Sequence, residues 1–286
     1  MTSNEKDAWR QKFLRVLAGF RLLDDDFMTA VFQDSLECTD LLLRILLGNP
    51  QIKATKVIAQ DTLKNLHGRS VRLDIHAWAD GQEFNIEIQR NKKGAAQRRA
   101  RYNSSLMDAG ALRAGDEYER LPESYVIFIT ETDVLGEGRP IYMIERVIRG
   151  SGRIFGDGSH IIYVNSAQPE EDTPLGRLMH DFRCTQAEDM HYAVLAERVR
   201  YLKTTEEGVR IMCEAMEMLT NEAEKRGMER GMERGMERGM ERGREERTIA
   251  VVLGMLREKL PLEMIARVSD ISMDEIRKIG RRHGLL

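Results

Sequence analysis

The chain has 286 residues, of which 42% are hydrophobic and 32% charged, and its net charge at pH 7 is -3. This composition is typical of a globular protein and excludes a disordered chain, while no apolar run approaches the roughly 18 residues that a membrane span needs. The small net charge excludes a surface that is basic all over, but it allows a local basic patch.

The N-terminus MTSNEKDAWRQKF mixes charges of both signs and has no apolar stretch, so we expect no secretory signal and a cytoplasmic protein. Cys38, Cys184 and Cys213 lie far apart, and we expect them to be buried thiols. Neither they nor the six histidines show zinc-binding spacing, so any metal must have oxygen ligands.

Hydrophobic periodicity predicts a mixed α/β core over residues 1–170. Residues 27–48 have helical spacing that ends at Gly48-Asn49-Pro50, which indicates one or two helices. Residues 94–113 also read as a helix. Period-two patterns predict strands at 71–89, 124–130, 141–148 and 160–164.

The rest of the chain is predicted to be helical, with an extension over 171–226 and a repeat at 227–243. The repeat is four copies of Gly-Met-Glu-Arg followed by Gly243. Each glycine lowers helix stability by about 1 kcal/mol relative to alanine, whereas Glu and Arg can pair along a helix. We expect a marginal helix or linker, and two interpretations remain open. One is a spacer lengthened by repeat slippage, and the other is right-handed self-association, since a period of four exceeds 3.6.

Residues 244–286 resemble a small helix-turn-helix unit. Pro261 suits a first helical turn, and Ser272 with Glu275 predicts a capping box for the last helix. That helix carries the basic residues Arg277, Lys278, Arg281 and Arg282. They could contact phosphates, or the segment could be a solvated cap or dimerisation tail.

Two strands within 71–89 are joined by Asp80-Gly81, a strong hairpin signal, and a two-residue loop pairs residues whose numbers sum to 161. The apolar residues then coincide on one face, as in the pairing of Ile75 with Ile86. On the polar face this register predicts that Asp74 lies directly opposite Glu87, and also places His76 and Trp78 there.

Carboxylates at opposed positions repel each other unless a cation or a proton lies between them. A hard ion such as Mg²⁺ binds through one or two carboxylates, waters and substrate phosphate. We therefore expect Asp74 and Glu87 to be metal ligands, with Gln89 on the same face orienting the attacking water. The alternative is a solvated edge hairpin. His76 is interpreted as a surface-strand residue without a role.

A basic segment follows the hairpin and suits an anionic polymer: residues 88–101 carry six basic side chains and no acidic one. On a helix, Arg98, Arg101, Tyr102 and Ser105 share a face from which they could reach phosphate, sugar or base. Lys92 and Lys93 complete the candidate DNA-binding set. The alternative is a solvated helix face.

At these residues the chain resembles the recombination-promoting nucleases and transposase-like proteins of the PD-(D/E)xK superfamily. The resemblance is carried by VRLDIHAWADGQEFNIEIQ, RARYNSSLMDAGALRAGDEY, LPESYVIFITETD, HIIYVN and IARVSDISMDEIRKI, and it spans nearly the whole chain. It implies a restriction-endonuclease-like mixed sheet flanked by helices, with a helical C-terminal extension. It also implies that Asp74 and Glu87 bind Mg²⁺, or alternatively Mn²⁺ or Ca²⁺.

The same resemblance places Gln89 where most relatives have lysine, and glutamine offers hydrogen bonds without a positive charge. Family members usually have an acidic residue near the start of the first helix, and by its spacing to Phe32 we choose Asp25. A helix-capping role is the alternative for that residue.

We expect a Mg²⁺-dependent DNA endonuclease, which the resemblance links to recombination or mobile elements. The expected partners are DNA and, through the C-terminal helices, a second copy of the chain, with no membrane. The alternative is a DNA-binding or assembly protein that keeps the nuclease fold with little cleavage. RNA as the substrate is a third reading.

Overall fold

The computed structural model describes residues 3–65, 68–90, 92–167 and 172–286. The chain divides into two compact units, Met1–Glu217 and Met218–Leu286. No helix in the described ranges is both long and apolar enough to cross a membrane.

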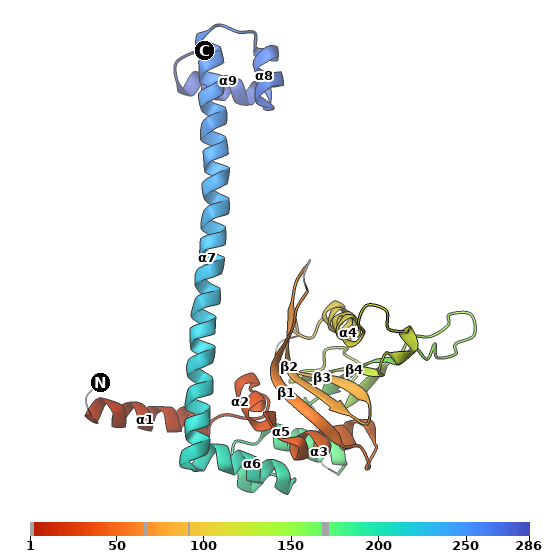
Figure 1. Cartoon of the computed structure of the whole chain (residues 1–286). Coiled ribbons are helices and arrows are strands. Elements are labelled where there is room, and N and C mark those ends of the chain that lie inside the picture. The colour runs from red at the N-terminus through yellow and green to blue at the C-terminus, as the bar shows by residue number, and fades with distance from the viewer. Residues whose placement is uncertain (1–2, 66–67, 91, 168–171) are drawn as a thin grey trace. The chain divides into compact units, whose positions relative to one another are not determined.

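The first unit is built on one six-stranded mixed sheet in the order β1-β2-β3-β4-β6-β5 (Figure 1). β1, β2 and β3 form an antiparallel meander, β4 and β6 continue the sheet in parallel with β3, and β5 pairs antiparallel with β6 at the edge. The strands are β1 (Ala54–Leu63), β2 (Val71–Ala79), β3 (Gln82–Gln89), β4 (Ser124–Thr130), β5 (Ile141–Ile144) and β6 (Ser159–Asn165).

The hairpin between β2 and β3 has the predicted turn. Asp80 and Gly81 both adopt positive φ, 49° and 78°, the conformation that a two-residue turn of this kind requires. Residues from Ala79–Gln82 to Ile75–Ile86 pair in the predicted register.

The ladder of described residues ends at Ile75 and Ile86, so Asp74 and Glu87 lie one position beyond the last backbone pair. There the Asp74 carboxylate accepts the Ile88 N–H at 3.2 Å, while Glu87 pairs on its other side with Phe128 of β4. A side chain is thus the acceptor for a backbone N–H where the β2–β3 ladder ends.

Among the described residues the first unit also contains six α-helices, and helix α7 begins in the same unit. They are α1 (Ser3–Ala18), α2 (Asp25–Phe32), α3 (Leu36–Leu47), α4 (Gln97–Ala111), α5 (Pro174–Arg183) and α6 (Ala193–Thr204). The predicted helical stretch at 27–48 is two helices, separated at Asp34, whose φ is 57°. α3 begins at the Ser35 cap and ends at left-handed Gly48, as the sequence indicates.

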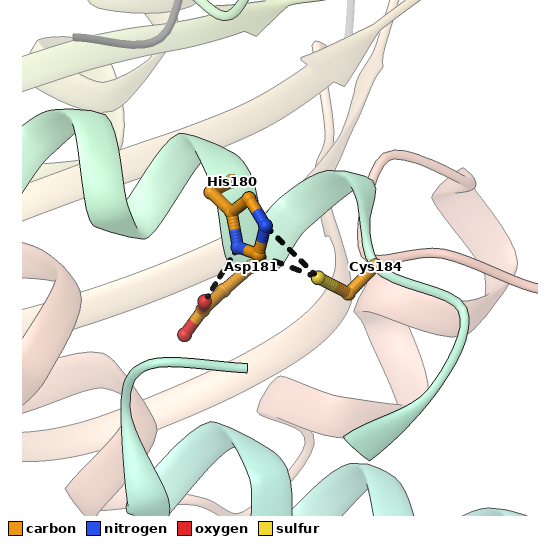
Figure 2. A group of neighbouring side chains, drawn as sticks. All are labelled: His180, Asp181 and Cys184. Carbon is orange, nitrogen blue, oxygen red and sulfur yellow. Dashed lines mark hydrogen bonds and ion pairs between the residues drawn. The ribbon is translucent and has the colours of Figure 1, made fainter. Parts of the chain in front are cut away.

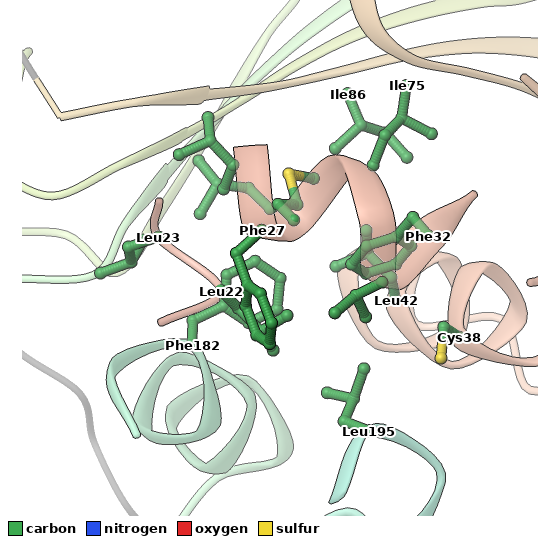
Figure 3. Close-up of a cluster of buried hydrophobic side chains, with 14 of the residues drawn as sticks. Leu22, Leu23, Phe27, Phe32, Cys38, Leu42, Ile75, Ile86, Phe182 and Leu195 are labelled. Carbon is green, nitrogen blue, oxygen red and sulfur yellow. The ribbon is translucent and has the colours of Figure 1, made fainter. Parts of the chain in front are cut away.

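The main hydrophobic core lies on the sheet face covered by α2, α3, α5 and α6. Phe27, Leu42, Phe182 and Leu195 pack there beneath sheet residues such as Ile86 (Figure 3). Cys38 belongs to this core, as expected of a buried thiol, whereas Cys184 and Cys213 are only half-buried. The expectation that Cys184 and Cys213 are buried is wrong, because both residues lie near the boundary of the core.

The opposite face of the sheet is covered by α4 (Figure 1). Ala100 and Met107 of that helix pack with Val126, Phe128 and Tyr163 into a second, smaller core. Both faces of β2 and β3 are therefore largely buried, and the polar face of the hairpin lies under a helix. This burial decides the chemistry of the site.

Helix α7 (Glu206–Arg257) starts immediately after α6. A Cβ at Gly208 would meet the Tyr201 carbonyl oxygen at 2.1 Å, so glycine is needed at this junction. The whole Gly-Met-Glu-Arg repeat lies inside this one helix.

In the second unit the last turns of α7 pack with α8 (Leu262–Ser269) and α9 (Met273–Arg282). Their small core contains Val252, Leu256, Ile265 and Ile276. α8 ends at Asp270 in a left-handed C-cap. The predicted capping box is confirmed, because Ser272 and Glu275 bond each other's backbone N–H.

Candidate active site

Asp74 of β2 and Glu87 of β3 form the centre of the candidate site. Glu87 is fully buried and Asp74 is 7% exposed, so the alternative of a solvated edge hairpin does not hold. Strand alternation directs both side chains away from the main core, and α4 then covers them. An ionised carboxylate is costly in such surroundings unless a positive charge or hydrogen-bond donors accompany it.

Burial raises the pKa of Asp74 well above its usual range, and the nearby carboxylates of Glu87 and Asp25 raise it further. Burial likewise raises the pKa of Glu87, while the Arg99 guanidinium opposes that rise. The pKa of each of these carboxyl groups therefore depends on the charge of its neighbours, as expected where carboxylates share a cation or a proton.

Asp25 is the first residue of α2, and its side chain opens to solvent. It is not the N-cap, a position held by Asp24. Desolvation by the surrounding protein raises the pKa of Asp25, and the adjacent Asp26 adds repulsion. Asp24 is tied to Arg90 at 3.0 Å, and this ion pair holds the start of α2 beside the end of β3.

Gln89 is half-buried at the end of β3, and its Nε2 lies 3.5 Å from Oε2 of Glu87. That distance is at the limit of a hydrogen bond. The amide brings no charge to the site. Like the other polar groups around Glu87, it faces the Glu87 carboxylate.

Arg99 of α4 is the residue that sequence reasoning missed. Its Nη2 donates to Oε2 of Glu87 and its Nη1 donates to the Gly94 carbonyl oxygen at 3.0 Å. The guanidinium also lies over the Phe128 ring, 5.8 Å from its centroid. The run of basic residues at 88–101 indicated positive charge near the site. However, the helix face predicted from residue spacing contained Arg98 and Arg101, not Arg99.

Buried amides complete the surroundings of Glu87. Asn103 of α4 donates from Nδ2 to Oε1 of Glu87 at 3.2 Å, while its own carbonyl oxygen has no partner among the described residues. Asn85, two residues before Glu87 on β3, is fully buried with both amide atoms unpaired in that same set. Unsatisfied buried polar atoms are rare, and they accompany sites that bind ions or water.

The predicted DNA-binding residues lie at the outer surface of this region. Lys92, Lys93, Arg98 and Arg101 are exposed. Tyr102 instead turns its hydroxyl inward, where it donates to the Arg69 carbonyl oxygen at 2.5 Å and accepts from Asn65. Tyr102 therefore holds the connection between β1 and β2 against α4.

The surface interpretation of His76 is wrong. The residue is 2% exposed, with Nδ1 at 2.6 Å from Asp61 and Nε2 at 2.6 Å from Glu83. Asp61 comes from β1, a strand that the sequence analysis did not predict. The burial follows because β1 covers the outer edge of β2.

A different cluster brings metal-ligand atoms closest together. Among the described residues, His180, Asp181 and Cys184 form a group of three with ligand atoms within 4.8 Å (Figure 2). However, Asp181 already accepts the backbone N–H groups of His191 and Tyr192, at 2.7 and 2.9 Å. Burial also raises the pKa of the Cys184 thiol to about 11. This cluster is best explained as a support for the turn before α6.

A mixed sheet flanked by helices, with two carboxylates on adjacent strands under a helix, defines the restriction-endonuclease-like class of nuclease folds. The sequence profile of PD-(D/E)XK nuclease family transposases matches residues 38–235, more than half of the chain. The chain therefore belongs to that family. The match includes Asp74, Glu87 and Gln89, whereas Asp25 lies before it. Comparisons with curated proteins and with solved structures gave no match.

Proposed function

We propose that this chain is a divalent-metal-dependent DNA endonuclease with a role in recombination or the movement of mobile elements. The observation that carries the proposal is the buried carboxylate pair Asp74 and Glu87, next to an exposed basic segment. Family membership supports nuclease chemistry. The role in recombination or mobile elements rests on that membership alone.

The site fits a hard cation in the chemistry of its donors. Asp74, Glu87 and Asp25 offer carboxylate oxygens, and the Asn103 carbonyl oxygen is buried without a partner among the described residues. Oxygen ligands of this kind suit Mg²⁺, Mn²⁺ or Ca²⁺. When bound, such an ion stabilises negative charge on phosphate and allows water to attack at neutral pH.

The chain's own residues would divide the remaining work. Asp74 and Glu87 hold the cation, with Asp25 as an additional carboxylate at the open side of the site. Gln89 orients the attacking water through its amide. The exposed side chains of Lys92, Lys93, Arg98 and Arg101 bind the phosphate backbone, which fixes the strand without reading its sequence.

Cleavage of supercoiled plasmid tests this proposal. The wild-type protein should nick or linearise DNA with Mg²⁺ or Mn²⁺, and Asp74→Ala and Glu87→Ala should each lower the rate by at least about a hundredfold. Glu119→Gln, which changes an exposed carboxylate elsewhere on the same unit, is the matched control. Equal cleavage by Asp74→Ala preparations would mean a contaminating nuclease. Competition between DNA and RNA substrates would show which of the two nucleic acids the protein cleaves.

A second candidate is a DNA-binding protein that keeps the nuclease fold and cleaves weakly or not at all. Two observations favour it: Gln89 lacks charge, and Arg99 already neutralises Glu87. Metal binding without cleavage would support this candidate. So would DNA affinity that Asp74→Ala leaves unchanged.

A further inference from the structure

Resting on the proposed nuclease function, we propose that Arg99 is a catalytic residue that binds the scissile phosphate. It supplies from α4 the positive charge that Gln89 does not supply from β3. The inference begins with Gln89, because a nuclease site needs a donor or cation for the charge that develops on phosphate. A glutamine amide meets that need only with weak neutral hydrogen bonds.

The position of Arg99 is fixed by three contacts from separate segments. Its guanidinium is bonded to Glu87 on β3, to the Gly94 carbonyl oxygen before α4, and lies over Phe128 on β4. Glu87 and Phe128 are themselves neighbours across the parallel strand pair. A side chain held in this way loses little further rotamer freedom when it binds a ligand.

Arg99 also keeps the capacity to bind a phosphate. Arginine has five N–H donors, and the hydrogen bonds to Glu87 and Gly94 engage two of them. The side chain is 35% exposed, so part of the guanidinium is open to an approaching strand. The planar fork can donate to Glu87 and to a phosphate oxygen at the same time.

The charges around the site agree with this assignment. The Arg99 guanidinium interacts favourably with all three site carboxylates, Asp25, Asp74 and Glu87. Arg98 and Arg101 on the same helix are exposed and form no ion pair within the described ranges. They are suited to backbone binding, whereas Arg99 alone of the three contacts a carboxylate of the site.

The competing explanation is that Arg99 is only a counter-ion that attaches α4 to the sheet. Arg99→Ala separates the two explanations when single-turnover cleavage at saturating Mg²⁺ is measured together with two other properties. These are the thermal midpoint and the binding of Mn²⁺ alone by calorimetry. Arg113→Ala is the matched control, because it removes an exposed arginine just after α4 that has no assigned role in the site or in DNA binding.

For a catalytic Arg99, we expect Arg99→Ala to lower the single-turnover rate by about 10²–10³-fold. Its affinity for Mn²⁺ should stay the same or rise, because Glu87 loses a competing cation. Arg99→Lys should retain a rate within about tenfold of wild type, since it keeps the charge and loses only the fork. Arg113→Ala should leave the single-turnover rate unchanged, because it lies outside the site and the DNA-binding set.

A rescue experiment makes the test sharper. Adding Gln89→Lys to Arg99→Ala places the missing charge on β3, and the double variant should recover the rate by at least about tenfold over Arg99→Ala. A mere counter-ion would give a lower thermal midpoint and no rescue. Wild-type cleavage by Arg99→Ala would overturn the Arg99 assignment and leave the nuclease proposal standing. Absence of cleavage by the wild-type protein with every metal would overturn both.

Discussion

His76 lies between two carboxylates, with Nδ1 at 2.6 Å from Asp61 and Nε2 at 2.6 Å from Glu83. The ring also packs on Trp78, with centroids 3.9 Å apart, and Lys56 lies over that same indole. His76 thus links β1, β2 and β3 two residues from Asp74.

Replacing His76 with alanine should destabilise the first unit. The buried Glu83 carboxylate would lose its partner, and we expect the free energy of unfolding to fall by about 3 kcal/mol. Urea unfolding followed by circular dichroism measures the change. In the double variant His76→Ala/Glu83→Gln part of the loss should return, because the unpaired group is then neutral. An unchanged midpoint for His76→Ala would contradict the structural role.

The metal-free protein should gain stability from Asp74→Asn. Burial and the Glu87 and Asp25 carboxylates raise the pKa of Asp74, so the folded protein binds this proton more tightly than the unfolded chain. Stability therefore falls as pH rises through that raised pKa, and the cost of the charged group is fully present at pH values above it. Asparagine removes this cost and keeps an acceptor for Ile88.

Thermal unfolding in EDTA tests this prediction. At pH 8 the midpoint of Asp74→Asn should rise by about 2–4 °C for each 1 kcal/mol of cost relieved. The difference should shrink toward pH 4, near the usual pKa of aspartate. A lower midpoint than wild type at pH 8 would show that the carboxylate is already neutralised in the folded protein.

At the scale of the elements, one lysine of α6 contacts the ends of two neighbouring helices. The ammonium group of Lys203 donates to the carbonyl oxygens of Ala18, Phe20 and Thr185, at 3.2, 2.6 and 2.6 Å. Ala18 is the last residue of α1, Phe20 follows α1 and Thr185 follows α5, so the lysine connects the ends of two helices to a third. It also lies over the Phe27 ring.

We expect Lys203→Met to lower the free energy of unfolding by about 2 kcal/mol, because the carbonyl oxygens lose their donor. Burial lowers the pKa of Lys203 to about 8 from 10.5, so between these values the folded protein binds fewer protons than the unfolded chain. Wild-type stability relative to the variant should therefore increase over that pH range. Guanidinium unfolding at pH 7 and 9.5 measures both effects, and the exposed Lys53→Met is the control.

The elements predicted from the sequence were those with a strong local signal. The β2–β3 hairpin alternates cleanly, β4 is a short apolar run, and α3 has a cap at each end, so local chemistry fixes their positions. β1 was missed because its polar and apolar residues do not alternate and its register shifts between Ala54 and Lys56. The predicted strand at 141–148 ends at Ile144.

At the scale of the whole molecule, the Gly-Met-Glu-Arg repeat in α7 has no binding partner assigned to it. Four methionines, Met228, Met232, Met236 and Met240, are 55–77% exposed at a spacing of four residues. The predicted segment boundaries after residues 170, 226 and 243 remain predictions. So does the association of two copies of the chain through the C-terminal helices. We propose that the methionine stripe contacts a second copy, since a row of exposed apolar side chains is costly in water.

Deleting residues 227–243 tests this proposal. The wild-type chain should have the mass of a dimer or larger assembly by light scattering, and the deletion variant should have the mass of a monomer. Exchanging the four methionines for glutamine is the milder control, because it keeps the helix length and removes only the apolar stripe. A mass that the deletion leaves unchanged would reject self-association and leave the spacer interpretation.

The sequence by itself determined the chemistry that the hairpin carries. Strand alternation and the Asp80-Gly81 turn are local properties, and they suffice to place Asp74 and Glu87 on one face of adjacent strands. Only the tertiary structure decided what surrounds those carboxylates. α4 crosses the polar face and brings Arg99 and Asn103 to Glu87 from residues far enough along the chain that no spacing rule connects them. Burial, shared charge and unsatisfied amides depend on how separate elements pack, and a one-dimensional pattern does not contain that packing.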